Sequence, residues 1–279
     1  MSKKETREAT VSSIFYPGKK EELKDTVRTF IEASEKTADD AQIILSPHAG
    51  YSYAGRFMGD AYKTASKRDI NRVFIISRVH REPEKSVFLP EYTAFATPSG
   101  ILEVDTEIVG TLLSSNQLFK TDNIPHTEEH SIEVQLPFIQ YLWPKAQIVP
   151  VLTGFPSLPI AKKLSSALKE AVLDSLESTL FVVSSNLSAY DHLNDAESDT
   201  NLFLKLLEQQ KWEEFPHMLD KGKINACSAD ALTALYFLFN GKLKHKVLSH
   251  SCDGNSVNNS KKKASEKRVC FGAISFYNR

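Results

Sequence analysis

The histidine in "SPHAGYSYAG" (residues 46–55) could do three kinds of chemistry. His48 leaves an apolar run, "QIILS", and could fill a turn, act as a general base or bind a metal ion. His80 stands in an equivalent place after "RVFIISRV", and Asn186 and His192 follow "TLFVVSS". Ligands of open α/β sheets bind outside the carboxyl ends of the strands, so side chains at these exits could converge on one point.

Cys227 and the pair His130 and Glu133 are further candidates. An apolar helical pattern begins at Cys227, and a helix N-terminus favours a thiolate because its free N–H groups stabilise negative charge. His130 and Glu133 are three residues apart and would share a helical face. Each candidate also has an ordinary interpretation, such as a turn or loop histidine, a buried small side chain or a surface pair. Taken singly, none of them settles a function.

A short pattern, "HTEEH" (126–130), suggests a different chemistry. It matches the H-x-x-E-H pattern of certain zinc peptidases, which requires both histidines on one helix and a carboxylate ligand downstream. Pro125 suits a helix start, but Pro137 interrupts the same helix after about two turns. A zinc peptidase is therefore the third and least favoured hypothesis.

Strands alternate with helices along the chain. Apolar runs predict strands at 42–46, 72–77, 147–153, 179–185, 245–251 and 269–276, and helical patterns occupy 20–36, 53–66, 105–116, 129–142, 158–176, 196–210 and 227–240. Most strand runs are apolar without alternation, as expected for strands buried on both faces. We therefore expect an α/β layered sandwich, with a central, mostly parallel sheet flanked by helices. No linker divides residues 1–279, so we expect a single domain, with a mobile loop or long hairpin connection over the lysine-rich stretch 253–268.

Composition excludes several classes of protein. The 279 residues carry 34 basic and 35 acidic side chains, which gives no bulk attraction to nucleic acid or to an anionic membrane. No apolar run reaches the roughly 20 residues of a membrane span, and the N-terminus lacks the apolar core of a signal peptide. The three cysteines are odd in number and widely spaced, which favours a reducing, cytoplasmic location and argues against a disulfide framework.

Several longer motifs occur together and in order. They are "PHAGYSYAG", "EEHSIEVQLPF", "IVPVLTG", "FVVSSNLS" and a cysteine before a late apolar helix. In this combination the chain resembles the Memo family, also called AmmeMemoRadiSam system protein B, from about residue 7 to residue 277. That family is similar in fold to the LigB-like class III extradiol dioxygenases, a single α/β domain with helices around a central sheet.

The resemblance implies a metal site of two histidines and one cysteine, which fall here on His48, His80 and Cys227. Such a set suits copper or iron, with zinc as another option, and suits magnesium or calcium poorly. The glycines of the first motif would let the backbone approach the metal, and Tyr51 and Tyr53 would wall the pocket. If protons are transferred, we expect His130 to be the acid or base and the carboxylate of Glu133 to orient its ring.

Departures from the family pattern leave the function open. The chain has "SRVHR" for the family's "GPSHH", so Arg81 replaces a histidine, and "SSNLSA" for "SSDxSH", so Asn186 replaces a carboxylate. A thiolate ligand also weakens the case for ring cleavage by a metal-dependent oxidoreductase. The first hypothesis is a redox-linked metal protein; the second is a divergent, non-catalytic protein that binds a peptide or protein through Tyr51, Tyr53 and Arg81. Association within the family implies AMMECR-type and radical-SAM proteins as partners.

Overall fold

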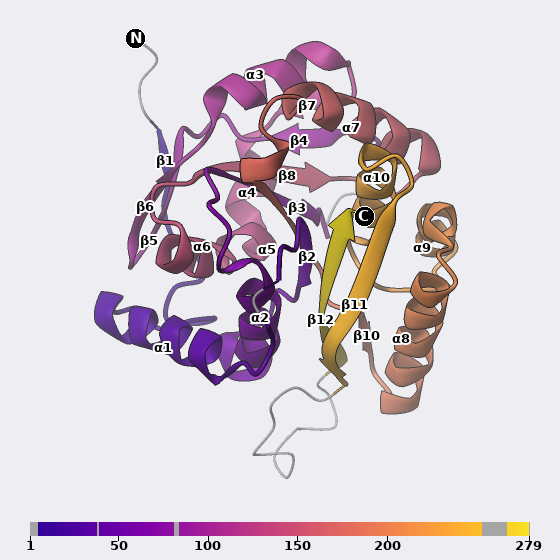
Figure 1. Cartoon of the computed structure of the whole chain (residues 1–279), viewed down its shortest axis with the longest axis horizontal. Coiled ribbons are helices and arrows are strands. Elements are labelled where there is room, and N and C mark those ends of the chain that lie inside the picture. The colour runs from indigo at the N-terminus through magenta and orange to yellow at the C-terminus, as the bar shows by residue number, and fades with distance from the viewer. Residues whose placement is uncertain (1–4, 38, 81–83, 253–266, 279) are drawn as a thin grey trace.

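Four parallel strands lie side by side in the middle of the molecule (Figure 1). The computed structural model describes residues 5–37, 39–80, 84–252 and 267–278. The four strands are, in spatial order, β2 (Ile43–Ser46), β9 (Thr179–Ser184), β3 (Arg72–Arg78) and β8 (Gln147–Thr153). Every residue of β2 and β9 is buried, as unbroken apolar runs predict for strands covered on both faces. The strands predicted from these runs are confirmed.

Antiparallel pairs flank this parallel centre on both sides. Strand β12 (Arg268–Asn278) pairs with β2, with β11 (Leu243–Ser251) and with β10 (Ser188–Tyr190). At the other side β4 (Val87–Leu89) pairs antiparallel with β8 and parallel with β7 (Phe119–Thr121) at the edge. A separate sheet joins β1 (Thr6–Arg7), β5 (Ala94–Thr97) and β6 (Gly100–Glu103). The α/β class is confirmed, with four parallel strands at the centre of the large sheet.

Helices cover both faces of the large sheet (Figure 1). One face carries α1 (Lys20–Ala33), α2 (Tyr51–Ala65) and α6 (Leu136–Leu142); the other carries α7 (Leu158–Ala171), α8 (Leu193–Glu208) and α10 (Ala229–Leu238). The remaining helices are α3 (Thr106–Ser115), α4 (Asn123–Glu128), α5 (His130–Glu133), α9 (Phe215–Asp220) and the 3-10 turns η1 (Leu176–Ser178) and η2 (Trp212–Glu214). The connection between two parallel strands of one sheet is right-handed. The chain crosses the sheet from β2 through β3 to β8 and then returns to β9, so the helices of the outward and the return connections lie on opposite faces.

The helix predicted over 129–142 is broken in two. Residues His130–Glu133 form α5, and α6 begins at Leu136 with Pro137 in its first turn. Proline lacks the N–H that would continue the preceding helix, but it fits a first turn, where that N–H has no partner. His130 and Glu133 are the first and last residues of the short helix α5.

The expectation that the cysteines are unpaired is wrong for two of them. Cys252 and Cys270 form a disulfide across β11 and β12, next to the paired residues Ser251 and Phe271. The two cysteines are 18 positions apart in sequence, and only the register of the two strands places them opposite one another. The loop predicted between them lies outside the described residues up to position 266.

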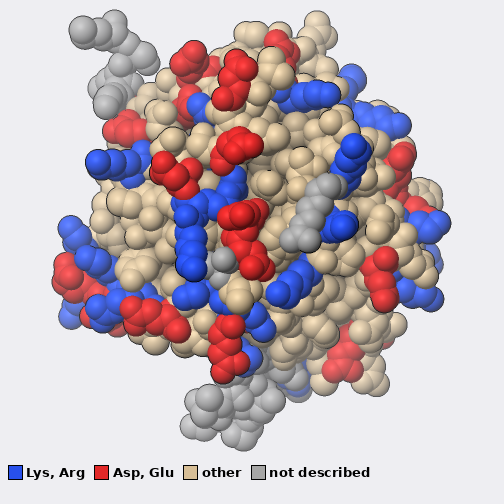
Figure 2. Space-filling model, in the orientation of Figure 1, with Lys and Arg blue, Asp and Glu red and all other residues tan. Residues whose placement is uncertain are grey.

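Acidic and basic side chains are interspersed over the face of the molecule that Figure 2 shows, in keeping with the balanced composition. In the described ranges, none of the helices has the length and apolar character that crossing a bilayer requires.

Candidate metal centre

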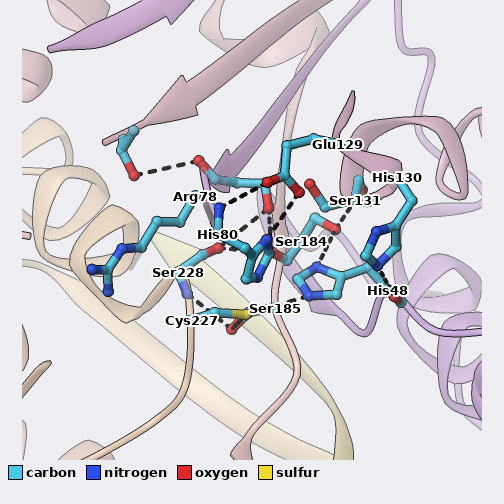
Figure 3. Close-up of polar contacts among 12 residues, drawn as sticks. His48, Arg78, His80, Glu129, His130, Ser131, Ser184, Ser185, Cys227 and Ser228 are labelled. Carbon is cyan, nitrogen blue, oxygen red and sulfur yellow. Dashed lines mark hydrogen bonds and ion pairs between the residues drawn. The ribbon is translucent and has the colours of Figure 1, made fainter. Parts of the chain in front are cut away.

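His48, His80 and Cys227 meet at the carboxyl ends of the central strands (Figure 3). His48 follows β2 and His80 follows β3, and these parallel strands are separated only by β9, so both chains leave the sheet at one edge. Cys227 reaches the same edge from the other direction, because it stands just before Ser228, the N-cap of α10. The expected convergence of the two histidines is observed, and the cysteine joins them.

The three side chains are close enough to share one ion. One ligand atom from each of them lies within 4.8 Å of the others. The Sγ of Cys227 is 3.4 Å from the Nε2 of His48, and the ring centroids of His48 and His80 are 5.3 Å apart. In the described residues this is the one group of three or more His, Cys, Asp or Glu side chains that converges in this way.

Ser184 fixes the orientation of the His48 ring. Its hydroxyl donates its only hydrogen to the carbonyl of Ser131 at 2.7 Å, and it accepts from the Nε2 amide of Gln135 at 3.0 Å. The Nδ1 of His48 lies 3.1 Å from the same hydroxyl. Because the hydroxyl has no second hydrogen to give, Nδ1 must be the donor. Nε2, the nitrogen that faces Cys227, is therefore the one that is left for a ligand.

Glu129 fixes the orientation of the His80 ring. One carboxylate oxygen accepts from the backbone N–H of His80 at 2.7 Å, and the other lies 2.9 Å from its Nδ1. A carboxylate only accepts, so Nδ1 carries a hydrogen and Nε2 is the nitrogen left for a ligand. A carboxylate behind a ligating histidine fixes its tautomer and raises its basicity. Both histidines thus present Nε2 toward the thiol.

Electrostatics favour an ionised thiol at this point. Burial raises the pKa of Cys227, but the charge and hydrogen bond of His48 and the hydrogen bond of His80 outweigh it and hold the pKa well below its usual value. Burial lowers the pKa of His80, yet its hydrogen bonds to Cys227 and Glu129 raise that pKa to about 10. In the absence of a metal ion these groups form a thiolate–imidazolium pair.

His130 lies beside the cluster, on the far side of His48 from Cys227 (Figure 3). Its ring packs 4.7 Å from that of Phe15, and its Nε2 donates to the backbone carbonyl of His48 at 3.1 Å. Burial, followed by the positive charge of His48, lowers the pKa of His130 to about 4. The ring is therefore neutral at pH 7, with its Nδ1 as the acceptor.

Glu133 is engaged elsewhere and does not orient His130. One of its oxygens accepts from Arg7 and from Thr10, and the other accepts from the N–H of Val11 and the hydroxyl of Tyr16. The expected His130–Glu133 pairing is thus replaced by an ion pair between Glu133 and Arg7, both buried. Glu133 thus faces the N-terminal segment, which supplies all of these partners.

The tyrosines expected to wall the pocket lie in other places. Tyr51 is 3% exposed and donates from its hydroxyl to the carbonyl of Val134, whereas Tyr53 is 47% exposed on α2. The glycine of the same motif, Gly55, makes room for the ring of Phe30 on α1, which a Cβ would meet at 2.2 Å. Tyr51 and Gly55 therefore serve the packing of helix α2, and Tyr53 faces solvent.

The remaining residues that the sequence suggested for the site are Asn186, His192 and Arg81. The Asn186 side chain accepts from the backbone N–H of His48 at 3.2 Å, so the amide supports the loop that carries a ligand. His192 is exposed at the start of α8, and Arg81 lies outside the described residues.

The zinc-peptidase pattern is not assembled. His126 lies in α4, is 1% exposed and contacts the carbonyl of Phe88 through Nε2. His130 opens a different helix, and the acid between them, Glu129, faces His80. Sequence reasoning missed Glu129 and Ser184 as supports of the cluster. In the sequence, these roles were indicated only by the position of Ser184 at a strand end and the position of Glu129 next to His130.

Comparisons with known proteins identify the family of the chain. The sequence profile of a family described as "Memo-like protein" matches residues 7–266. The chain belongs to the Memo family. A "MEMO1 family protein" of Nitrosopumilus maritimus is 26% identical over 97% of this chain and 99% of its own length. Another, from Caldivirga maquilingensis, is 30% identical over 90% of this chain and 93% of its own length.

One solved structure is also similar. The "uncharacterized protein JW3007" of Escherichia coli K12 has a TM-score of 0.46 and 9% identity, covering 84% of this chain and 98% of that one. 

The donor set of this Memo-family chain fits a transition-metal ion. Two imidazole nitrogens and a thiolate suit copper, iron and zinc, and a set without oxygen suits magnesium or calcium poorly. The support of both rings through Nδ1 is the arrangement that ligating histidines adopt. The residues therefore fit the kind of ion that the family resemblance implies.

Proposed function

We propose that this Memo-family chain holds one redox-active ion, copper or iron, through His48, His80 and Cys227. The observation that carries the proposal is the tautomeric state of the two rings. Ser184 and Glu129 accept from the two Nδ1 atoms, so Nε2 is the nitrogen of each ring that is left for an ion, beside a thiol of lowered pKa, and a bound ion would replace the Nε2 hydrogen of the His80 imidazolium. A site preorganised in this way binds an ion without first reorganising its ligands.

A bound copper or iron ion would supply one-electron chemistry. The residues of the chain would supply the rest. His130 is neutral, lies next to His48 and keeps Nδ1 as an acceptor, so it is placed to take up a proton from a group near the cluster. Phe15 covers one side of its ring and keeps water from that side.

The test is the metal content of protein purified anaerobically under reducing conditions. We expect near-stoichiometric copper or iron in the wild type and a sharp loss in Cys227→Ser and His48→Ala. His192→Ala is the matched control, since His192 is exposed and outside the cluster. Zinc in place of copper or iron would refute the redox part of the proposal. A wild type that takes up none of these ions, even when Cu(I) and Fe(II) are offered, would refute the site and leave the partner-binding hypothesis.

A further inference from the structure

A cavity of about 250 Å³ opens directly beside the cluster. Arg78, Val79 and His80 line one side, at the end of β3, and Ile224, Asn225 and Cys227 line the other. Pockets for drug-sized ligands are larger, at roughly 300–1,000 Å³. The volume therefore suits a small molecule of a few carbon atoms, one end of which can reach a ligand of the proposed metal.

Arg78 supplies the charge in this cavity. Its Nε donates to the carbonyl of Gly154 at 3.2 Å, which fixes the plane of the guanidinium. Within the described residues, the Gly154 carbonyl is the one hydrogen-bond acceptor that contacts this guanidinium, and no carboxylate forms an ion pair with it. Asp230 is near enough for the charge of Arg78 to act on its carboxyl group, but no ion pair joins the two. The Nη edge is the one that takes a carboxylate or phosphate with two parallel hydrogen bonds.

The wall that faces Arg78 is held in place. The N–H of Asn225 donates to Asp199 at 3.2 Å, and the N–H of Ser228 donates to Ser185 at 3.1 Å. The guanidinium itself is turned away from the His80 ring (Figure 3). An anion bound to Arg78 would thus leave the end of the cavity next to His80 and Cys227 for the remainder of the ligand.

We infer that Arg78 binds the anionic head, a carboxylate or a phosphate, of a small ligand whose other end faces the His48–His80–Cys227 cluster. The role of that other end rests on the proposed metal site, whereas the anion subsite does not. A subsite of this kind would set the choice of ligand.

The test uses metal-free, full-length protein and two probes, succinate and inorganic phosphate, with binding measured by calorimetry. We expect Arg78→Gln to weaken binding of the preferred probe by about tenfold or more, because a charge-assisted pair of hydrogen bonds is lost. Arg78→Lys keeps the positive charge but loses the two parallel N–H donors of the guanidinium, so its affinity for the probe should lie between those of the wild type and Arg78→Gln. Arg56→Gln, which removes an exposed arginine on α2, is the matched control. Tighter binding of succinate identifies a carboxylate head, and tighter binding of phosphate identifies a phosphate head.

A second readout locates the probe. Bound at Arg78, it should slow alkylation of Cys227 in the wild type and not in Arg78→Gln. Failure of the wild type to bind either probe, equal binding by Arg78→Gln, or an alkylation rate that saturating probe leaves unchanged would each overturn the inference. Loss of the metal site would not be confused with these results, because the measurements are made without metal. Conversely, Arg78→Gln should retain the metal content of the wild type.

Discussion

Replacement of Glu129 by glutamine tests whether the ring of His80 is held in the form that can bind a metal ion. The substitution keeps the size of the side chain and removes its charge. The amide oxygen can still accept from the backbone N–H of His80, which lies 2.7 Å from the carboxylate in the native protein. The amide NH₂ then faces Nδ1, 2.9 Å away in the native geometry, and a donor there favours the tautomer with its hydrogen on Nε2.

A metal ion on Nε2 requires the ring hydrogen on Nδ1, where it would face the amide NH₂ and lack an acceptor, so metal binding is weakened. Replacing the carboxylate behind a ligating histidine typically costs about 10–100-fold in metal affinity, or about 1.4–2.7 kcal/mol. We expect a loss of this size in Glu129→Gln, together with a lower free energy of unfolding of the metal-free protein at neutral pH, because the His80 imidazolium loses its carboxylate partner. Glu129→Asp, which keeps the charge on a shorter side chain, should lose less.

The assay is anaerobic competition between the protein and a chromophoric chelator of known affinity for Cu(I) or Fe(II). Glu197→Gln is the control for removal of one negative charge, because Glu197 is exposed on α8. An affinity of Glu129→Gln within twofold of the wild type, measured beside a His48→Ala variant that no longer binds, would show that the tautomer argument is incorrect.

Three further predictions concern the fold around the cluster. Glu133→Gln should lower the free energy of unfolding by about 3–5 kcal/mol, since it leaves the charge of Arg7 buried without its partner; urea unfolding measures this, and a loss of metal binding without a loss of stability would contradict the structural role. Burial lowers the pKa of His126 from 6.5 in the unfolded chain to about 3 in the folded protein. The stability this provides is complete above pH 6.5 and is lost as the pH falls from 6.5 toward 3, at up to about 1.4 kcal/mol per pH unit. The free energy of unfolding of metal-free His126→Gln should therefore depend less steeply on pH between pH 7 and pH 4 than that of the wild type. An unchanged slope would contradict this role of His126. Reduction of the Cys252–Cys270 bond, which spans 18 positions, should lower stability by about 3 kcal/mol and expose two further thiols to titration; finding all three cysteines titratable in unreduced, denatured protein would mean that the bond does not form.

Local patterns in the sequence were sufficient to predict the elements that build the fold. The runs that became β2, β3, β8 and β9 are apolar throughout because both faces of a parallel centre are buried. Once these strands were predicted, His48 and His80 could be placed at strand ends. The meeting of Cys227 with His48, 179 positions earlier, was implied only by the family resemblance.

Contacts between distant segments were not predictable in the same way. Glu133 is separated from Arg7 by 126 positions and Glu129 from His80 by 49, and the Cys252–Cys270 bond depends on the register of an antiparallel pair. Nothing in the residues near Glu133 distinguishes a carboxylate that orients His130 from one that binds an arginine at the start of the chain. That choice follows from the packing of the N-terminal segment, with Arg7, Thr10 and Tyr16, against α5.

The sequence by itself therefore determined the strands, the helices and the strand ends where polar side chains gather, because hydrophobic periodicity is a local property. Only the tertiary structure decided which nitrogen of each histidine faces Cys227 and which carboxylate supports His80. Those choices depend on hydrogen bonds whose partners come together when the sheet and its helices pack.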